Sequence, residues 1–567
     1  MKKVFVTIAC AALALHASAQ TWQDALLFSR NDYSGSARSV GMGGAMTALG
    51  GDPGSLTFNP AGSAVASYSQ VVLTPGLSFA GSKTQGVSEG ASHLPVGLGN
   101  TEHSSLVRFK LPNAGVIIHL PTGNRYGLRS SSLGVMVNST ADYTGELHAS
   151  GINGDNSFAG SLASSARGFN PDVMGQEDWF YDGSDYARLP AWIDMTGYRA
   201  GLFDAQLNDQ GQFTGDYVGA TDFMGSSGRP GLIGPLDQEY GQKTTGYKSD
   251  ILFNYAVNFN DNLFIGANLG VTTLSYGLQE YWAESANNPN DFVPVQYEDG
   301  IFAAFRSLEM KHSLSLKGTG AYFKLGALWR PVAGLRVGAA IQTPTLIHLT
   351  ERYAYQAQAT FEGRYLSPVK SPEDEWHYVL RSPFRANVGV AYTLGRLAAV
   401  SLDYELTDYG NARFLYNTDT GYSEGNFNAV NDEIEKLLGA SHIFKAGLEV
   451  KPIPALALRA GYNYITSAQY GQFENGRIKG LSAQERRALA THQASLGAGL
   501  SLGAFFADVA VRMRFVPFET IVPYVYWKYE TDETEFYRKT EDTSVLTPMV
   551  RTDWTLVQAF LTLGWRF

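Results

Sequence analysis

Residues Leu263-Phe-Ile-Gly-Ala-Asn-Leu-Gly-Val271 alternate between large apolar and small or polar side chains. The odd positions carry Leu, Ile, Ala, Leu and Val, whereas the even positions include Gly266, Asn268 and Gly270. A period of two is typical of a β-strand whose two faces meet different surroundings. The stretch therefore predicts a strand with one apolar face and one small or polar face.

The same alternation recurs in five further stretches of the chain. These are residues 321–329, 335–342, 385–392, 456–463 and 557–566. A soluble β-sandwich also alternates in this way, so the period alone does not decide the class. The polar faces, however, are rich in glycine and single arginines, which favours a polar barrel lumen over a solvated sheet face.

The connections between the predicted strands alternate between tight turns and long loops, as in outer-membrane barrels. Counting strands between them predicts an all-β fold, a transmembrane antiparallel β-barrel of about fourteen strands. The tight turns are expected near residues 123, 261, 331–334, 395, 452–454 and 503, and the long loops at about 82–103, 149–245, 284–304, 361–377, 417–441, 467–490 and 531–549.

Both ends of the chain point to export into the outer membrane of a Gram-negative bacterium. Lys2 and Lys3 precede an apolar run to Leu15 and a small-residue cleavage site at 17–19, which predicts a cleaved signal peptide at 1–19. Cleavage would remove Cys10, the only cysteine. The C-terminal strand, residues 560–567, ends in an aromatic and resembles the assembly signal read by the barrel assembly machinery, with Trp565 and Phe567 as its key residues.

Composition supports a folded, lipid-facing protein. Glycine makes up 61 of 567 residues, above the usual frequency of about 7%, while aromatics reach 13% and charged residues only 17%. The formal net charge is −10 and no basic patch stands out, so nucleic acid is not an expected partner. We expect a monomer embedded in outer-membrane lipid.

The segment between the signal peptide and the first strand differs from the barrel wall. Residues 34–62 are small and turn-rich, as suits a compact piece folded inside a lumen. We therefore predict an N-terminal hatch or plug at 20–66 and a barrel at 67–567, whose largest external loop is 149–245.

This hatch sequence resembles that of the FadL/TodX family of outer-membrane transporters for hydrophobic compounds, in a Bacteroidetes-like form. The resemblance rests on Arg38, Gly41 and Gly43, followed by Asn59-Pro60-Ala61, and it recurs along the barrel at 336–344, 403–409 and 459–462. Gly44 is a further hatch residue expected to need tight backbone geometry. The resemblance implies a fourteen-stranded barrel plugged by its hatch, a hydrophobic site near the external loops, and passive uptake of fatty acids or aromatic hydrocarbons.

Two sets of residues are candidates for handling such a ligand. Alternation breaks at Asn138, Ser139 and Thr140 in the third strand, where the resemblance implies a lateral opening; a position at the external water interface would explain the break equally well. Apolar residues of the hatch start and the long loop are candidate ligand contacts, although each could serve loop packing alone: Trp22, Leu26, Phe28, Trp179, Phe180, Tyr181, Trp192, Ile193 and Met195.

Motifs for enzyme chemistry are weak. Gly41-Met-Gly-Gly-Ala-Met46 lacks the third glycine of a dinucleotide fingerprint. Gly421-Tyr-Ser-Glu-Gly425 matches a nucleophile elbow, but that motif requires a strand-to-helix turn in an α/β sheet, which we do not expect here. The histidines are scattered without metal-ligand spacing. We expect no metal, no cofactor and no enzymatic activity.

Three function classes remain open at this point. The favoured class is a passive transporter for hydrophobic small molecules. The second is a FadL-like partner-binding barrel of a type IX secretion system. The third and weakest is an outer-membrane lipid hydrolase acting through Ser423.

Overall fold

A computed structural model describes residues 20–87, 97–176, 179, 190–224, 230–296, 302–418, 421–474, 477–524 and 548–567. The predicted signal peptide lies outside the described residues. Among the described residues, no helix is long and apolar enough to cross a membrane.

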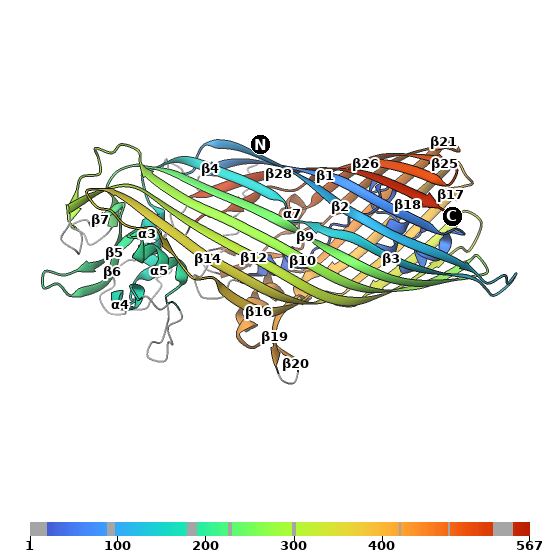
Figure 1. The fold of residues 1–567 in the computed structure, drawn as a ribbon, viewed down its shortest axis with the longest axis horizontal. Helices are drawn as coiled ribbons and strands as arrows, with labels where there is room; N and C mark the ends of the chain where they lie inside the picture. The colour runs from blue at the N-terminus through green and yellow to red at the C-terminus, as the bar shows by residue number, and fades with distance from the viewer. Residues whose placement is uncertain are drawn as a thin grey trace.

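The described strands form one closed, antiparallel barrel with fourteen positions, which confirms the predicted fold class (Figure 1). Each position, called a stave here, is one long strand or two strands that follow one another. The first strand pairs with the last, and all six predicted tight turns join neighbouring staves. The staves in order are β1 (Gln70–Val87), β2 (Thr101–Pro121), β3 (Leu128–Asp142) with β4 (Gly145–Asn153), β9 (Leu236–Phe259), β10 (Leu263–Ala286), β12 (Phe302–Trp329), β13 (Leu335–Gln342) with β14 (Leu346–Glu362), β16 (Asp374–Arg381) with β17 (Arg385–Leu394), β18 (Ala398–Asp408) with β19 (Arg413–Thr418), β21 (Ala440–Ile453), β22 (Leu456–Ile465), β25 (Thr491–Leu502), β26 (Phe505–Phe515) and β28 (Met549–Arg566).

The outer face of the wall changes character along each long strand. On β12 the outward side chains are apolar between Ala321 and Trp329, but polar from Lys317 back to Lys311, while the inward side chains are mostly buried. An exposed apolar belt on a closed barrel requires a lipid bilayer to cover it. The belt therefore lies in the membrane, and the polar upper part of the strand stands in water.

The long strands correct the predicted loop boundaries. The expected loop 149–245 begins inside β4 and ends inside β9, and the expected loops 82–103 and 284–304 also overlap strand residues. The error has a physical cause: beyond the membrane the outer face is polar, so apolar alternation disappears although the strand continues.

The chain between β4 and β9 forms a cap at the extracellular end of the barrel (Figure 1). Its helices and hairpins pack around one apolar cluster that includes Phe158, Leu162 and Phe203. The described elements are α3 (Phe158–Ala166), α4 (Pro171–Met174), α5 (Trp192–Arg199), β5 (Phe203–Leu207) with β6 (Phe213–Gly219), and β7 (Asp222–Met224) with β8 (Pro230–Leu232).

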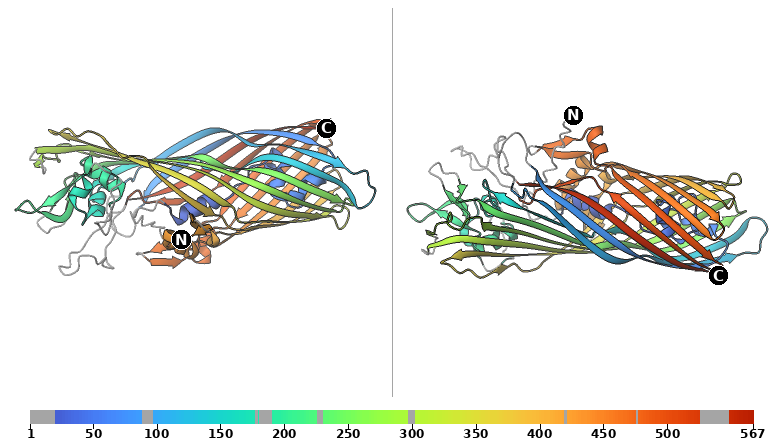
Figure 2. Two further views of the ribbon diagram at one scale, coloured as in Figure 1. Left: turned by 60° about the horizontal axis from the view of Figure 1, so that its bottom comes forward. Right: turned by 90° about the horizontal axis from the view of Figure 1, so that it is seen from above.

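The N-terminal segment 20–66, called the hatch here, lies inside the barrel near its periplasmic half (Figure 2). It is built from α1 (Trp22–Ser29), α2 (Ala37–Gly41) and two 3-10 turns, η1 (Pro53–Thr57) and η2 (Pro60–Val65). Most of its side chains are buried, and they contact inward-facing residues on many strands.

Phe567 closes the barrel at the seam. Its N–H donates to the Ser69 carbonyl at 3.0 Å, and the Ser69 N–H donates back to the Phe567 carbonyl at 3.0 Å. Deleting Phe567 removes this pair together with the terminal aromatic, so we expect a large loss of membrane-inserted barrel. Heat-modifiable mobility on gels measures the folded fraction. Tyr365→Ala, at an exposed loop aromatic, is the control and should behave as wild type. Wild-type folding of the deletion variant would contradict the expectation.

Candidate functional site: a luminal pocket, the hatch and a break in the wall

Cationic side chains of the wall hold the hatch by its backbone carbonyls. Lys248 Nζ donates to the Phe28 carbonyl at 2.7 Å, and Lys324 Nζ donates to the Thr57 carbonyl at 2.6 Å. Arg512 donates to the carbonyl of Tyr33 at 2.9 Å, while Arg385 and Arg336 donate to the carbonyls of Ser29 and Leu49. Hydrogen bonds from charged donors are about twice as strong as neutral ones. These contacts explain the single basic residues on the inward strand faces.

A buried ion-pair network fixes Arg38 of the hatch. Its Nε lies 2.9 Å from Glu449 Oε2, and the same oxygen lies 2.7 Å from Nε of Arg459. Arg459 also reaches Asp508 at 2.6 Å. Removing one partner of such a network leaves an uncompensated buried charge, which is strongly destabilising. Arg38 therefore holds α2 in one position against the wall.

The Asn59-Pro60-Ala61 turn fits against wall glycines. Asn59 Nδ2 donates to the carbonyls of Thr47 at 2.8 Å and Ala327 at 2.9 Å, and Asn59 Oδ1 accepts from the Ala61 N–H at 3.1 Å. A Cβ added to Gly326 would lie 2.0 Å from Asn59 Oδ1. Close approach of the hatch is thus one reason why the luminal faces are rich in glycine.

Gly43 and Gly44 form the tight bend after α2. Their φ angles are +65° and +70°, in the left-handed region that glycine enters at little cost. A Cβ on Gly43 would also meet the wall at Tyr462 N, 3.0 Å away.

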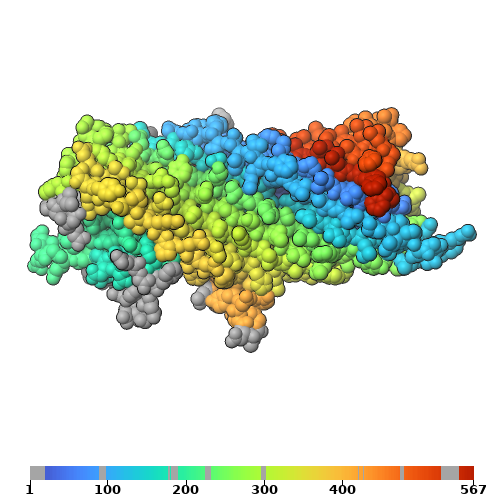
Figure 3. Space-filling model, viewed as in Figure 1, coloured from blue at the N-terminus to red at the C-terminus, as the bar shows by residue number. Residues whose placement is uncertain are grey.

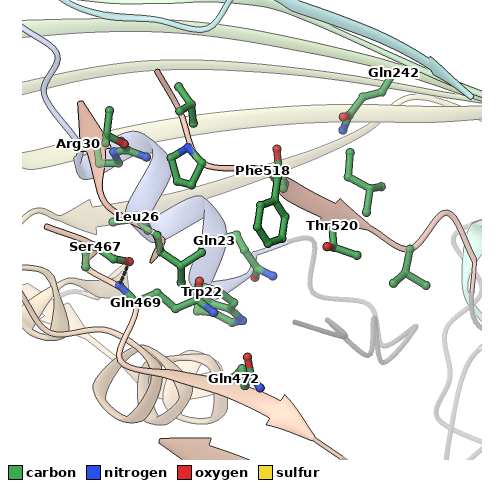
Figure 4. A pocket seen from close by; sticks show the side chains of 18 of the residues that line it. Trp22, Gln23, Leu26, Arg30, Gln242, Ser467, Gln469, Gln472, Phe518 and Thr520 are labelled. Atoms are coloured by element: carbon green, nitrogen blue, oxygen red, sulfur yellow. Dashed lines mark hydrogen bonds between the residues drawn. The ribbon is translucent and has the colours of Figure 1, made fainter. Parts of the chain in front are cut away.

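A cavity of about 630 Å³ lies between the hatch helix α1 and the cap. Trp22 and Leu26 face it from α1, and Phe518 faces it from the chain that follows β26 (Figure 4). Phe158 and Leu162 of α3 line it from the cap. Polar residues are about as numerous in the lining and include Arg30, Gln242 and Gln469, while the exposed surface of the cavity is more apolar than polar. Such a mixed lining suits a small molecule with an apolar body and a polar end.

The structure places the candidate ligand contacts in different surroundings. Trp22, Leu26 and Ile193 line the cavity. The remaining described candidates pack elsewhere: Phe28 lies against Tyr143 and Tyr276 with ring centroids 6.0 and 5.3 Å apart, Trp179 pairs with Trp192 at 5.8 Å, and Met195 is buried in the cap cluster. Phe180 and Tyr181 lie outside the described residues. Sequence reasoning missed Arg30, Phe158 and Phe518, which carry no motif.

A buried carboxylate anchors the cap over this cavity. Glu284 of β10 accepts from the Phe158 N–H at 2.6 Å and from Gln238 Nε2 at 2.6 Å, so it holds the N-terminus of α3. Burial raises the pKa of Glu284 to about 7. Since this value exceeds the ordinary 4.5, ionisation weakens the folded cap as the pH rises from about 4.5 towards 7.

The barrel wall is interrupted between the second and third staves. The β2–β3 ladder runs from Pro121↔Ser130 to Asn113↔Asn138 and then stops. Above this point the described residues of β2 pair only with β1, whereas the third stave continues on β9. There it passes behind β1, where Ser82 Oγ donates to the Glu146 carbonyl at 2.6 Å. We call this interruption the wall break.

Asn138, Ser139 and Thr140 stand at the foot of the wall break and contact the hatch. Asn138 Nδ2 donates to Thr57 Oγ1 at 2.8 Å. The carbonyls of Ser139 and Thr140 accept from the hatch N–H groups of Ser34 at 2.9 Å and Asp32 at 2.6 Å. The hatch thus satisfies backbone groups that the neighbouring strand leaves free, as a low-dielectric membrane requires.

Asp142, the last residue of β3, connects the third stave to β1, β28 and β2 through its side chain. It accepts from Ser78 Oγ at 2.8 Å and from Gln558 Nε2 at 3.3 Å, and it forms an ion pair with Lys110 of β2. The wall break is therefore closed by side chains and hatch contacts rather than by a continuous ladder.

The nucleophile-elbow match lies in an extracellular hairpin. It lies between a short strand and a helix, because β20 (Gly421–Ser423) is followed by η5 (Gly425–Phe427) and α6 (Asn428–Leu437). However, β20 is a three-residue strand that pairs antiparallel with β19, not a central strand of a parallel sheet. Among the described residues, no histidine is hydrogen-bonded to Ser423.

The fold and the interior together define an outer-membrane β-barrel with an internal plug. The sequence matches no protein-family model, and comparison with curated proteins finds no match. Solved structures similar to this chain include a FadL homologue of Pseudomonas aeruginosa (11% identity, 94% of this chain and 98% of that chain, TM-score 0.45). They also include the toluene transporters TbuX of Ralstonia pickettii (12%, 94% and 98%, TM-score 0.44) and TodX of P. putida (12%, 94% and 98%, TM-score 0.46).

Removing residues 21–62 should open a continuous path along the lumen, because the hatch fills the space between the wall cations described above. We expect a higher single-channel conductance in planar bilayers. Arg38→Ala should give an intermediate effect, with frequent brief openings, since it releases only α2. Arg487→Ala on the exposed helix α7 (Ala483–Ala488) is the matched control. Unchanged conductance after the deletion would show that the hatch does not block the lumen.

Proposed function

We propose that this protein is a passive outer-membrane channel for hydrophobic small molecules, which enter the luminal cavity and leave sideways through the wall break. One observation carries this proposal: the hatch whose helix α1 lines the luminal cavity also seals the interruption of the wall. Phe28 of α1 packs on Tyr143, immediately after the third strand, and so connects the two places.

The cavity favours a long-chain carboxylate over a neutral aromatic hydrocarbon. Arg30 lines the cavity beside Leu26 (Figure 4). Among the described residues its guanidinium makes no hydrogen bond, and the carboxylates of Asp32 and Glu519 line the same cavity. Arg514 also lines the cavity but is paired with Asp32 at 3.3 Å. A buried guanidinium whose N–H groups make no hydrogen bond is stabilised when an anionic ligand group accepts from them. We therefore propose fatty acids as the substrate class, with the carboxylate at Arg30 and the alkyl chain along Trp22 and Phe518.

Sideways release is favoured by the energetics of the cargo. Moving an alkyl chain from water into hydrocarbon stabilises it by about 0.8 kcal/mol per CH₂ group, so release of a long chain into lipid is favoured by on the order of 10 kcal/mol over release into the periplasm. Opening the break requires the hatch to give up the bonds of Asp32 and Ser34 to the third strand. Opening also separates the contacts of Asp142 and leaves each buried backbone group without a partner, at about 1–3 kcal/mol per group, so the open state is a minor population.

Cross-linking across the break tests the exit. Lys110→Cys with Asp142→Cys places two thiols at a contacting pair, and the predicted mature chain has no other cysteine. A short bis-methanethiosulfonate linker should abolish uptake of a radiolabelled long-chain fatty acid by proteoliposomes, and reduction should restore it. The pair Lys311→Cys and Gln356→Cys, neighbours on β12 and β14 in the water-exposed wall, is the control, and its cross-linking should leave uptake intact.

Binding must be measured in the same samples. Cross-linked protein should retain the fatty acid in its cavity, because the block lies after the binding site. Full uptake with the break cross-linked would exclude this exit and favour passage along the lumen.

A further inference from the structure

The outer wall carries a second apolar cavity, distinct from the luminal one. It has a volume of about 890 Å³, faces the lipid side, and is lined almost entirely by apolar atoms of β25, β26, β28, β1, β2 and β3. Figure 3 shows part of this wall, where β1 and β2 (blue) lie beside the C-terminal strand (red). We call this cavity the outer recess.

The hydrogen-bond register shows how the outer recess runs. Phe505, Trp565, Val71, Val116 and Val135 are successive partners in one row across five strands. The row starts next to the tight β25–β26 turn, on the periplasmic side of the barrel where such turns lie. The recess thus begins at the periplasmic rim.

The neighbouring row reaches the wall break. Its members are Ala507, Leu563, Leu73, Ala114 and Val137, and Val137 directly precedes Asn138, the last β3 residue that pairs with β2. The two alanines leave the wall shallow between larger side chains. Including β25, the recess crosses five strand spacings, roughly 24 Å at about 4.8 Å each, which is comparable to an extended long alkyl chain.

We propose that the outer recess receives the alkyl chain of a fatty acid as it leaves through the wall break, and guides it towards the periplasmic leaflet. This inference rests on the proposed function. Its physical basis is continuity: the upper end of the recess lies one residue from the break, and its lining presents almost no polar atom. A chain lying in it gains packing contacts that fluid lipid supplies less well. The recess is therefore an intermediate binding site between the barrel and the bulk membrane.

Photo-labelling tests this site directly. The probe is a long-chain fatty acid with a diazirine at the end of its alkyl chain, added to proteoliposomes of the wild-type protein, and the labelled peptides are identified by mass spectrometry. We expect labelling of 71–73, 114–116 and 563–565 that unlabelled fatty acid competes away. Ala114→Phe and, at the rim, Ala507→Phe should remove this competed labelling and slow transfer into the bilayer. Ala327→Phe, on the outer face of β12, adds the same bulk outside the recess and is the control.

Each outcome decides the inference. Labelling at the recess that is no stronger than around residue 327, and that unlabelled fatty acid does not reduce, would mean bulk lipid contact and would overturn it. If Ala114→Phe fails to fold by heat-modifiable mobility, Ala507→Phe decides alone, and unchanged competed labelling in it would overturn the inference. Labelling at Trp22 and Phe518 that unlabelled fatty acid reduces distinguishes the two proposals. If it occurs while the recess is unlabelled, the proposed channel function holds and the recess proposal fails. If it does not occur, both proposals are overturned.

Discussion

A bilayer offers no partner to a backbone N–H or C=O group, and the membrane-spanning part of this structure depends on that constraint. Thirteen of the contacts between neighbouring staves satisfy their backbone groups with ladders of interstrand hydrogen bonds, including the β1–β28 seam that ends at Ser69 and Phe567. Between β2 and β3 the ladder of hydrogen bonds extends only to Asn138. Beyond this point the hatch supplies two N–H groups to the third strand, so barrel closure depends on the hatch.

The same requirement explains the charge distribution inside the barrel. Lysines and arginines of the wall point inward and bind hatch carbonyls or buried carboxylates, while the outer belt is apolar. Such contacts act together with several apolar clusters, which include Met46, Leu56 and Phe58, to fix the position of the hatch. They also leave the extracellular side of α1 free to line the cavity with Trp22 and Leu26. The polar contacts that hold the hatch therefore also determine the position of the cavity and of the wall break.

The barrel was predictable from the sequence wherever one strand face touches lipid, as in 263–271 and 321–329. The upper strands, such as 236–245 of β9, were not predictable, because a strand in water shows no apolar alternation. The irregularity at Asn138 was visible in the sequence, but the hatch partners at Asp32 and Ser34 were not, since they depend on backbone contacts between distant segments. Arg30 was missed for a similar reason: only the fold shows that it lines a cavity.

The central claim is a path from the luminal cavity through the wall break. A crystal structure with a long-chain fatty acid brominated at its chain end tests it most directly, because anomalous scattering locates the bromine. The account predicts the carboxylate at Arg30 and bromine either beside Phe518 or at the break near Asn138 and Asp142. Bromine on the barrel axis between the hatch and the periplasmic turns would contradict the account and establish passage straight through the lumen.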